Sequence, residues 1–104
     1  MAHEVIEKHP SAEYTQTVDF TDELTGDTSI SAGSAVTAID SNGDPITSII
    51  GTVSRSGMVL SAVLQAGTDG EDYTVFFAGR GSTTSQDAIR VIEMRVRQRH
   101  LGAV

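Results

Sequence analysis

The chain has 104 residues, with fourteen acidic and seven basic side chains, a formal net charge of −7 at pH 7, and no cysteine. A domain of this length buries enough surface to fold without disulfides, and a chain without cysteine has neither a disulfide framework nor a thiolate metal site. The acidic excess repels a phosphate backbone, and no run of residues approaches the roughly 18 apolar residues of a membrane span. We therefore expect neither nucleic acid nor a membrane as a partner.

The charge is distributed unevenly along the chain. Residues 1–72 carry twelve acids and two bases, a net charge of −10, whereas residues 73–104 carry two acids and five arginines, a net charge of +3. Such an asymmetry favours head-to-tail contacts between copies or contacts with a different protein. The alternative interpretation is a well-solvated surface with one basic edge.

The first residues differ in character from the rest. Residues 1–11 show no sustained periodicity, and Pro10 would end any short helix, so we predict an N-terminal arm. The first fifteen residues also lack the apolar stretch of a secretory signal, which leads us to expect synthesis in the cytoplasm of the host cell.

From residue 12 onward the pattern is that of short strands separated by turns. Tyr14–Phe20 alternates between two faces, and we expect its first and last residues, both aromatic, in the core. Ile30–Ile39 and Ile46–Val53 are the next strand candidates. Asn42–Gly43 lies between them and predicts a tight hairpin turn, because both residue types accept a positive φ.

Three more strand candidates follow. Met58–Ala66 alternates between two fairly apolar faces, which predicts a central strand. Tyr73–Ala78 is the next candidate, and the last runs from about Asp87 to Arg97. In this last strand we expect Ala88, Ile92, Met94 and Val96 inward and Ile89, Val91, Glu93, Arg95 and Arg97 outward. The spacing of the strands predicts an all-β sandwich or small barrel over residues 12–97, with a C-terminal tail over residues 98–104.

One pair of residues favours a particular sandwich. Asp69 lies four residues before Tyr73, which opens an apolar strand. This is the arrangement of the tyrosine corner in immunoglobulin-like sandwiches, where the phenol is partly buried and its hydroxyl bonds to the backbone of the preceding turn. We therefore predict a structural role for both residues, and an immunoglobulin-like antiparallel β-sandwich of about seven strands with extended N- and C-terminal arms.

The catalytic and metal-binding motifs are incomplete. His3 and His9 lack the spacing of a zinc-protease helix. Asp40–Asp44 begins like a calcium loop, but the twelfth loop position is Gly51 instead of glutamate, so a plain turn explains the same residues; the acidic cluster Asp69–Asp72 has the same ambiguity. All three histidines lie near the ends of the chain, so a nucleophile and its base would require the two ends to meet. We expect no catalytic residue, no metal site, no cofactor and no small-molecule substrate.

Four segments resemble a known family. Glu13–Phe20, Leu24–Ile30, Gly67–Val75 and Val91–Arg97 are similar to the small immunoglobulin-like virion proteins of tailed bacteriophages, the fibre-tail adaptor proteins. The resemblance covers roughly residues 8–97 and is carried by turn and strand signatures. Phe76–Arg80 departs from the Thr-rich strand that the family usually has at this place.

The resemblance implies a non-enzymatic structural protein of the virion, in the neck or tail, that joins the tail to fibres or to neighbouring tail proteins. The implied partners are other virion proteins and further copies of this chain in a ring. Four arginines that we expect to point outward are the candidate contacts to an acidic neighbour: Arg90, Arg95, Arg97 and Arg99. Two alternatives remain open. One is a capsid decoration protein, with hundreds of copies per particle instead of about a dozen, and the other is a carbohydrate- or calcium-binding β-sandwich module.

Overall fold

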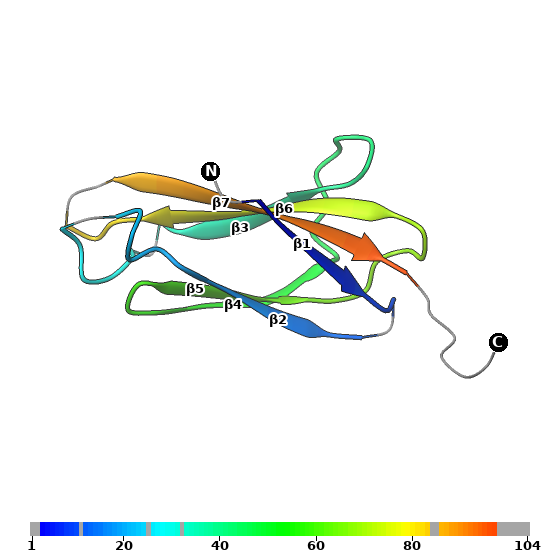
Figure 1. Cartoon of the computed structure of the whole chain (residues 1–104), viewed down its shortest axis with the longest axis horizontal. Helices are drawn as coiled ribbons and strands as arrows, with labels where there is room; N and C mark the ends of the chain where they lie inside the picture. Colours follow the sequence, from blue (N-terminus) through cyan, green and yellow to red (C-terminus); the bar gives the residue numbers. More distant parts are fainter. Residues whose placement is uncertain (1–2, 11, 25, 32, 84–85, 98–104) are drawn as a thin grey trace.

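The computed structural model describes residues 3–10, 12–24, 26–31, 33–83 and 86–97. These residues form seven strands in two sheets and no helix (Figure 1). The strands are β1 (His3–Lys8), β2 (Tyr14–Asp19), β3 (Ala35–Ile39), β4 (Ile50–Ser56), β5 (Val59–Leu64), β6 (Asp72–Arg80) and β7 (Asp87–Val96). The all-β class and the two-layer architecture are those that the strand spacing predicts.

The strands divide into a four-stranded and a three-stranded sheet. The first has the order β1-β7-β6-β3 and the second the order β2-β5-β4. The chain crosses from one sheet to the other after β1, β2, β3 and β5, whereas β4–β5 and β6–β7 are antiparallel hairpins within a sheet. The central position predicted for Met58–Ala66 is confirmed, because β5 pairs with a strand on each side.

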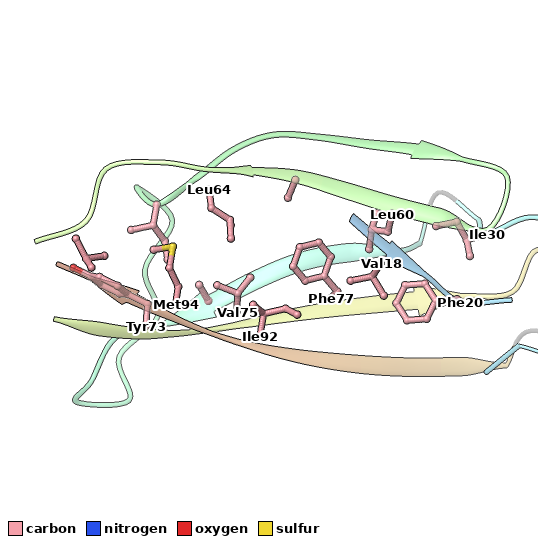
Figure 2. Close-up of a cluster of buried hydrophobic side chains, with 14 of the residues drawn as sticks. Val18, Phe20, Ile30, Leu60, Leu64, Tyr73, Val75, Phe77, Ile92 and Met94 are labelled. Atoms are coloured by element: carbon pink, nitrogen blue, oxygen red, sulfur yellow. The ribbon is translucent and has the colours of Figure 1, made fainter. Parts of the chain in front are cut away.

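The core lies between the two sheets and is built by period-2 alternation. Side chains from β2, β5, β6 and β7 meet there (Figure 2). The largest fully buried side chains include Phe20, Leu60, Phe77, Ile92 and Met94. Each such side chain stabilises the fold by roughly 1.5–3 kcal/mol relative to an exposed position. The inward set expected for β7 is therefore confirmed, with Ala88 half-buried at its outer end.

The prediction of an N-terminal arm over residues 1–11 is corrected by the structure. His3–Lys8 forms β1, which pairs with β7 in parallel register, so the four-stranded sheet is mixed and not wholly antiparallel. The segment HEVIEK is short and charged, and its partner lies at the other end of the chain, which explains why local periodicity does not reveal it. The predicted C-terminal tail, residues 98–104, lies outside the described residues.

The predicted hairpin at Asn42–Gly43 is half right. Gly43 has φ +85° and donates to the carbonyl of Asp40 at 3.0 Å, so a tight turn is present. The strands on either side of it, however, belong to different sheets. A single bridge joins Ile39 to Pro45. The chain then passes to the three-stranded sheet, where β4 begins only at Ile50.

The two aromatic residues expected in the core behave differently. Phe20 is completely buried, as expected, whereas Tyr14 is 44 % exposed, which contradicts the prediction. Tyr14 opens β2, an edge strand that pairs only with β5. Its side chain has the strand parity of the buried Val18, so it lies on the inner side of the sheet, at the first position of the strand, where burial is incomplete.

Candidate interaction surface

Strand alternation places a group of apolar side chains on the outer face of the four-stranded sheet. Phe76 stands directly opposite Val91, and Ala78 directly opposite Ile89, in the antiparallel pair of β6 and β7. On the other side of β7, Val5 of β1 lies beside Glu93, diagonal to Val91. We call these five apolar residues the outer patch: Val5, Phe76, Ala78, Ile89 and Val91.

The outer patch is partly open to solvent. Val5 is 49 % and Ile89 is 50 % exposed, and the other three members are half-buried. Val5 and Ile89 are two of four large hydrophobic side chains that are exposed in the described part of the chain. Contiguous exposed apolar side chains on a sheet face are typical of a contact surface, whereas isolated ones are ordinary.

Ion pairs stand at both ends of the outer patch. At one end Arg80 lies 3.8 Å from Asp87, with both side chains at least half exposed. At the other end Arg97 contacts Asp72 at 2.8 Å, and Arg95 contacts Glu93 at 3.3 Å. The surface therefore has an apolar centre between charged, solvated ends, which is the general anatomy of a protein interface.

Of the four arginines proposed as contacts, the three that the structure describes do not form one cluster. Arg95 and Arg97 lie at the same end of the sheet, and Arg97 also donates to the backbone carbonyls of Glu71 and Val96. Both are engaged within the chain, so an acidic neighbour would compete with existing partners. Arg99 lies outside the described residues.

The structure contradicts the prediction that Arg90 points outward. It has the same strand parity as Ile92 and therefore faces the inner side of the sheet. There its guanidinium donates to Glu23 Oε1 at 2.6 Å, and its side chain is only 22 % exposed. The contact links β7 to the loop that follows β2, so Arg90 has a structural role within the chain.

The contact predicted for Tyr73 is present. The backbone N–H of Thr68 donates to the Tyr73 hydroxyl at 3.0 Å, and the tyrosine is 4 % exposed. Gly67 has φ +96°, and a Cβ built on it would stand 2.7 Å from Cγ2 of Val96. The turn between β5 and β6 is thus packed tightly against the end of β7. Asp69 lies in the same turn and is exposed.

The two acidic segments considered for calcium are organised by their own hydrogen bonds. Asp40 Oδ1 accepts from the backbone N–H groups of Asn42 and Asp44. Ser41 donates to Glu71 at 3.0 Å, which links the turn after β3 to the turn before β6. Within the described residues no group of three His, Asp or Glu side chains is arranged to hold a metal ion, and no pocket is found.

Two buried polar side chains were not predicted from the sequence. Lys8 is 5 % exposed, and its ammonium donates to the carbonyls of His9 at 2.7 Å, Pro10 at 3.4 Å and Ala12 at 2.9 Å. Burial lowers the pKa of Lys8 below its ordinary value of 10.5. Gln16 is also 5 % exposed, and its Nε2 donates to the carbonyl of Thr17. The only signal in the sequence is strand parity, since Lys8 shares a strand face with the partly buried Ile6, and Gln16 shares one with the buried Val18.

The sequence was compared with protein families and with curated proteins. No protein family's sequence profile matches the chain, and no significant match is found among curated proteins. In the described part of the chain no helix is long and apolar enough to span a membrane.

Proposed function

We propose that this chain is a non-enzymatic structural protein of a tailed-phage virion, an adaptor in the neck or tail that joins neighbouring proteins. The resemblance of its four segments to fibre-tail adaptor proteins is the first support. The second is strand order. With β1–β7 taken as strands A to G, the sheets contain B, E, D and G, F, C, which is the partition of an immunoglobulin-type sandwich. The first strand lies beside β7 instead of β2.

The outer patch is the observation that carries the adaptor role. Its centre, where Phe76 stands opposite Val91, is apolar, and its ends bear the Asp72–Arg97 and Arg80–Asp87 pairs. Such a surface fits a flat protein partner with an apolar centre and a mixed-charge rim, because the rim fixes the orientation while the centre supplies the binding energy. In the proposed role the partner is another virion protein or a neighbouring copy.

Incorporation into particles tests this proposal with a matched pair of variants. Ile89→Ser changes the outer patch, and Val53→Ser changes another exposed apolar side chain, which lies on β4 in the other sheet; Ile89 is 50 % and Val53 is 41 % exposed. Virions produced with each variant are purified, and the chain is quantified by mass spectrometry relative to the major tail protein. The proposal predicts a clear loss of the Ile89→Ser chain and normal incorporation of Val53→Ser. Absence of the unmodified chain from purified virions, or equal incorporation of both variants, would count against it.

A further inference from the structure

The outward side chains of β6 and β7 form five rows across the four-stranded sheet. They alternate with the inward residues of the same strands, and in each row one residue of β6 stands directly opposite one of β7. The rows are Asp72 with Arg95, Thr74 with Glu93, Phe76 with Val91, Ala78 with Ile89, and Arg80 with Asp87. Both end rows therefore combine an acid with an arginine, and the third and fourth rows are apolar on both strands.

This order of residues makes the face complementary to a second copy of itself. A two-fold axis that runs along the strands, midway between β6 and β7, lays β6 of one copy over β7 of the other. In all five rows, each outward side chain then meets the residue type that already stands opposite it in its own sheet. Two sheets that pack face to face lie about 10 Å apart, with strand directions within about 30° of each other, so this superposition is an ordinary sheet packing.

Opposite charges meet at both ends of such an interface. Arg80 comes over Asp87 of the second copy, and both side chains are at least half exposed. At the other end, Arg95 comes over the second copy's Asp72, which is also the partner of Arg97 within its own chain. Each end thus gathers charges of both signs from two molecules, and such complementarity fixes the partner and its orientation.

Apolar side chains meet at the centre. In the third and fourth rows apolar residues lie over apolar ones, so that Ile89 comes over Ala78 of the second copy. Val5 of β1 extends the contact, because it comes over Ile39, the outward residue of β3 in the same row. Both of the exposed members of the outer patch, Val5 and Ile89, therefore have an apolar counterpart. The removal of this apolar surface from water supplies the energy of association.

A two-fold axis that runs across the strands gives a poorer match. It reverses the order of the rows, so the second row of one copy falls on the fourth row of the other. Glu93 would then lie over Ile89, and burying a carboxylate against an apolar side chain is costly. With the axis along the strands, Glu93 comes over Thr74 instead, whose hydroxyl can donate to a carboxylate. The five rows therefore favour the axis along the strands.

We propose that two copies of this chain associate face to face through β6 and β7 about this axis, with the outer patch at the centre of the interface. A surface that meets an identical surface in this way forms a closed dimer. The inference rests on the proposed function in one respect, because it takes the outer patch as a protein interface, and it names a second copy as the partner. It requires no particular place of the chain in a virion.

The association of the purified chain in solution provides the first test. Sedimentation of the wild-type chain over a wide concentration range should show a reversible equilibrium between monomer and dimer. Ile89→Ser should raise the dissociation constant roughly tenfold or more, because it changes an apolar contact that occurs twice in the dimer. Val53→Ser is the matched control on the other sheet and should leave this constant unchanged. A wild-type chain that is monomeric at all concentrations, or equal effects of the two variants, would overturn the proposal.

Charge reversal tests which residues face each other. Arg80→Glu places a carboxylate over Asp87 of a second identical chain, and Asp87→Arg places a guanidinium over Arg80. Each variant alone should therefore dimerise several-fold more weakly than wild type. An equimolar mixture of the two variants restores opposite charges at both of these contacts. We expect the mixed dimer, followed by a fluorescent label on one variant, to form several-fold more readily than the dimer of either variant alone.

The mixture also separates contact between copies from effects inside one copy. Arg80 and Asp87 are register partners in one chain, so each variant brings its own like-charge neighbours into the mixture unchanged. A lower stability of the variants therefore cannot produce the recovery. If the mixture associates no better than the single variants, the dimer about the axis along the strands is wrong.

The two proposals fail in different ways. A monomeric chain whose incorporation into virions still depends on Ile89 would overturn the dimer and leave the adaptor role in place. A chain that dimerises as described but is absent from purified virions would support the dimer and count against the adaptor role.

Discussion

The ring of Phe20 lies against the backbone of Gly79, so closely that a Cβ built on the glycine would stand 2.7 Å from the ring. Gly79 is an inward position of β6, and Phe20 follows β2, so this contact joins the two sheets near one end of the core. Phe20 is completely buried.

We expect Gly79→Ala to lower the free energy of unfolding by about 1–3 kcal/mol, because overpacking forces either the ring or the strand to shift. Denaturant unfolding measures this loss. The double variant Gly79→Ala/Phe20→Leu should be less destabilised than the sum of its single variants, because the smaller side chain makes room for the methyl group. Strict additivity would show that the two residues do not press on each other.

Removing the hydroxyl of Tyr73 should destabilise the turn between β5 and β6. Tyr73→Phe loses the hydrogen bond from the Thr68 N–H, for which we expect a loss of about 0.5–1.5 kcal/mol in thermal or denaturant unfolding. Tyr14→Phe is the control, since Tyr14 is 44 % exposed and its change should stay within roughly 0.5 kcal/mol. Equal effects of the two substitutions would contradict the role assigned to the Tyr73 hydroxyl.

The contact between Arg90 and Glu23 should support the fold, whereas the one between Arg95 and Glu93 should contribute little. Arg90→Ala is expected to cost about 1 kcal/mol, less at high salt, because the 2.6 Å pair is partly shielded from solvent. Arg95→Ala should change stability by less than about 0.5 kcal/mol, since Arg95 is 47 % exposed. Unfolding curves at low and high salt distinguish the two. A larger effect at Arg95 would reverse our assignment.

Stability should rise with pH on the alkaline side because of Lys8. Burial lowers its pKa in the folded state, so in the window between that lowered pKa and 10.5 the unfolded chain binds more protons than the folded one. Raising the pH through this window therefore favours folding, relative to a variant without the titrating group. Lys8→Met keeps a long apolar side chain and removes the ammonium. The stability difference between wild type and variant should shift in favour of wild type as pH rises, and a flat difference would contradict the effect of burial.

Much of the core could be predicted from sequence, because one buried face imposes alternation over a whole strand. Both Met58–Ala66 and Asp87–Arg97 show this pattern. The first strand is central as predicted, and the second buries Ile92, Met94 and Val96 on its predicted inward face. The hydroxyl contact of Tyr73 is also local, spanning five residues, and was predicted from the spacing alone. Arg90 is a different case. Its inward parity can be read from the strand, but its charge led to the expectation of an outward position.

Strand periodicity does not predict the remaining features. β1 is recognisable only beside β7, at the opposite end of the chain. Asn42–Gly43 specifies a turn, but the sheet that receives the next strand is decided by packing across the core. Lys8 is buried where the carbonyls of His9 and Ala12 accept from its ammonium, which no periodicity records. Part of the outer patch was predicted, since Ile89 and Val91 were expected to point outward from the last strand.

The most direct test of the proposed virion role is an electron-microscopy map of the intact phage particle in which we propose that this chain is a subunit. The account predicts about six to twelve copies of the sandwich, the size of a closed ring, at the portal–tail junction or at the base of the fibres. It also predicts that the outer patch, with Phe76 and Val91 at its centre, faces a neighbouring subunit. Hundreds of copies spread over the capsid, or no copy in the particle, would contradict it.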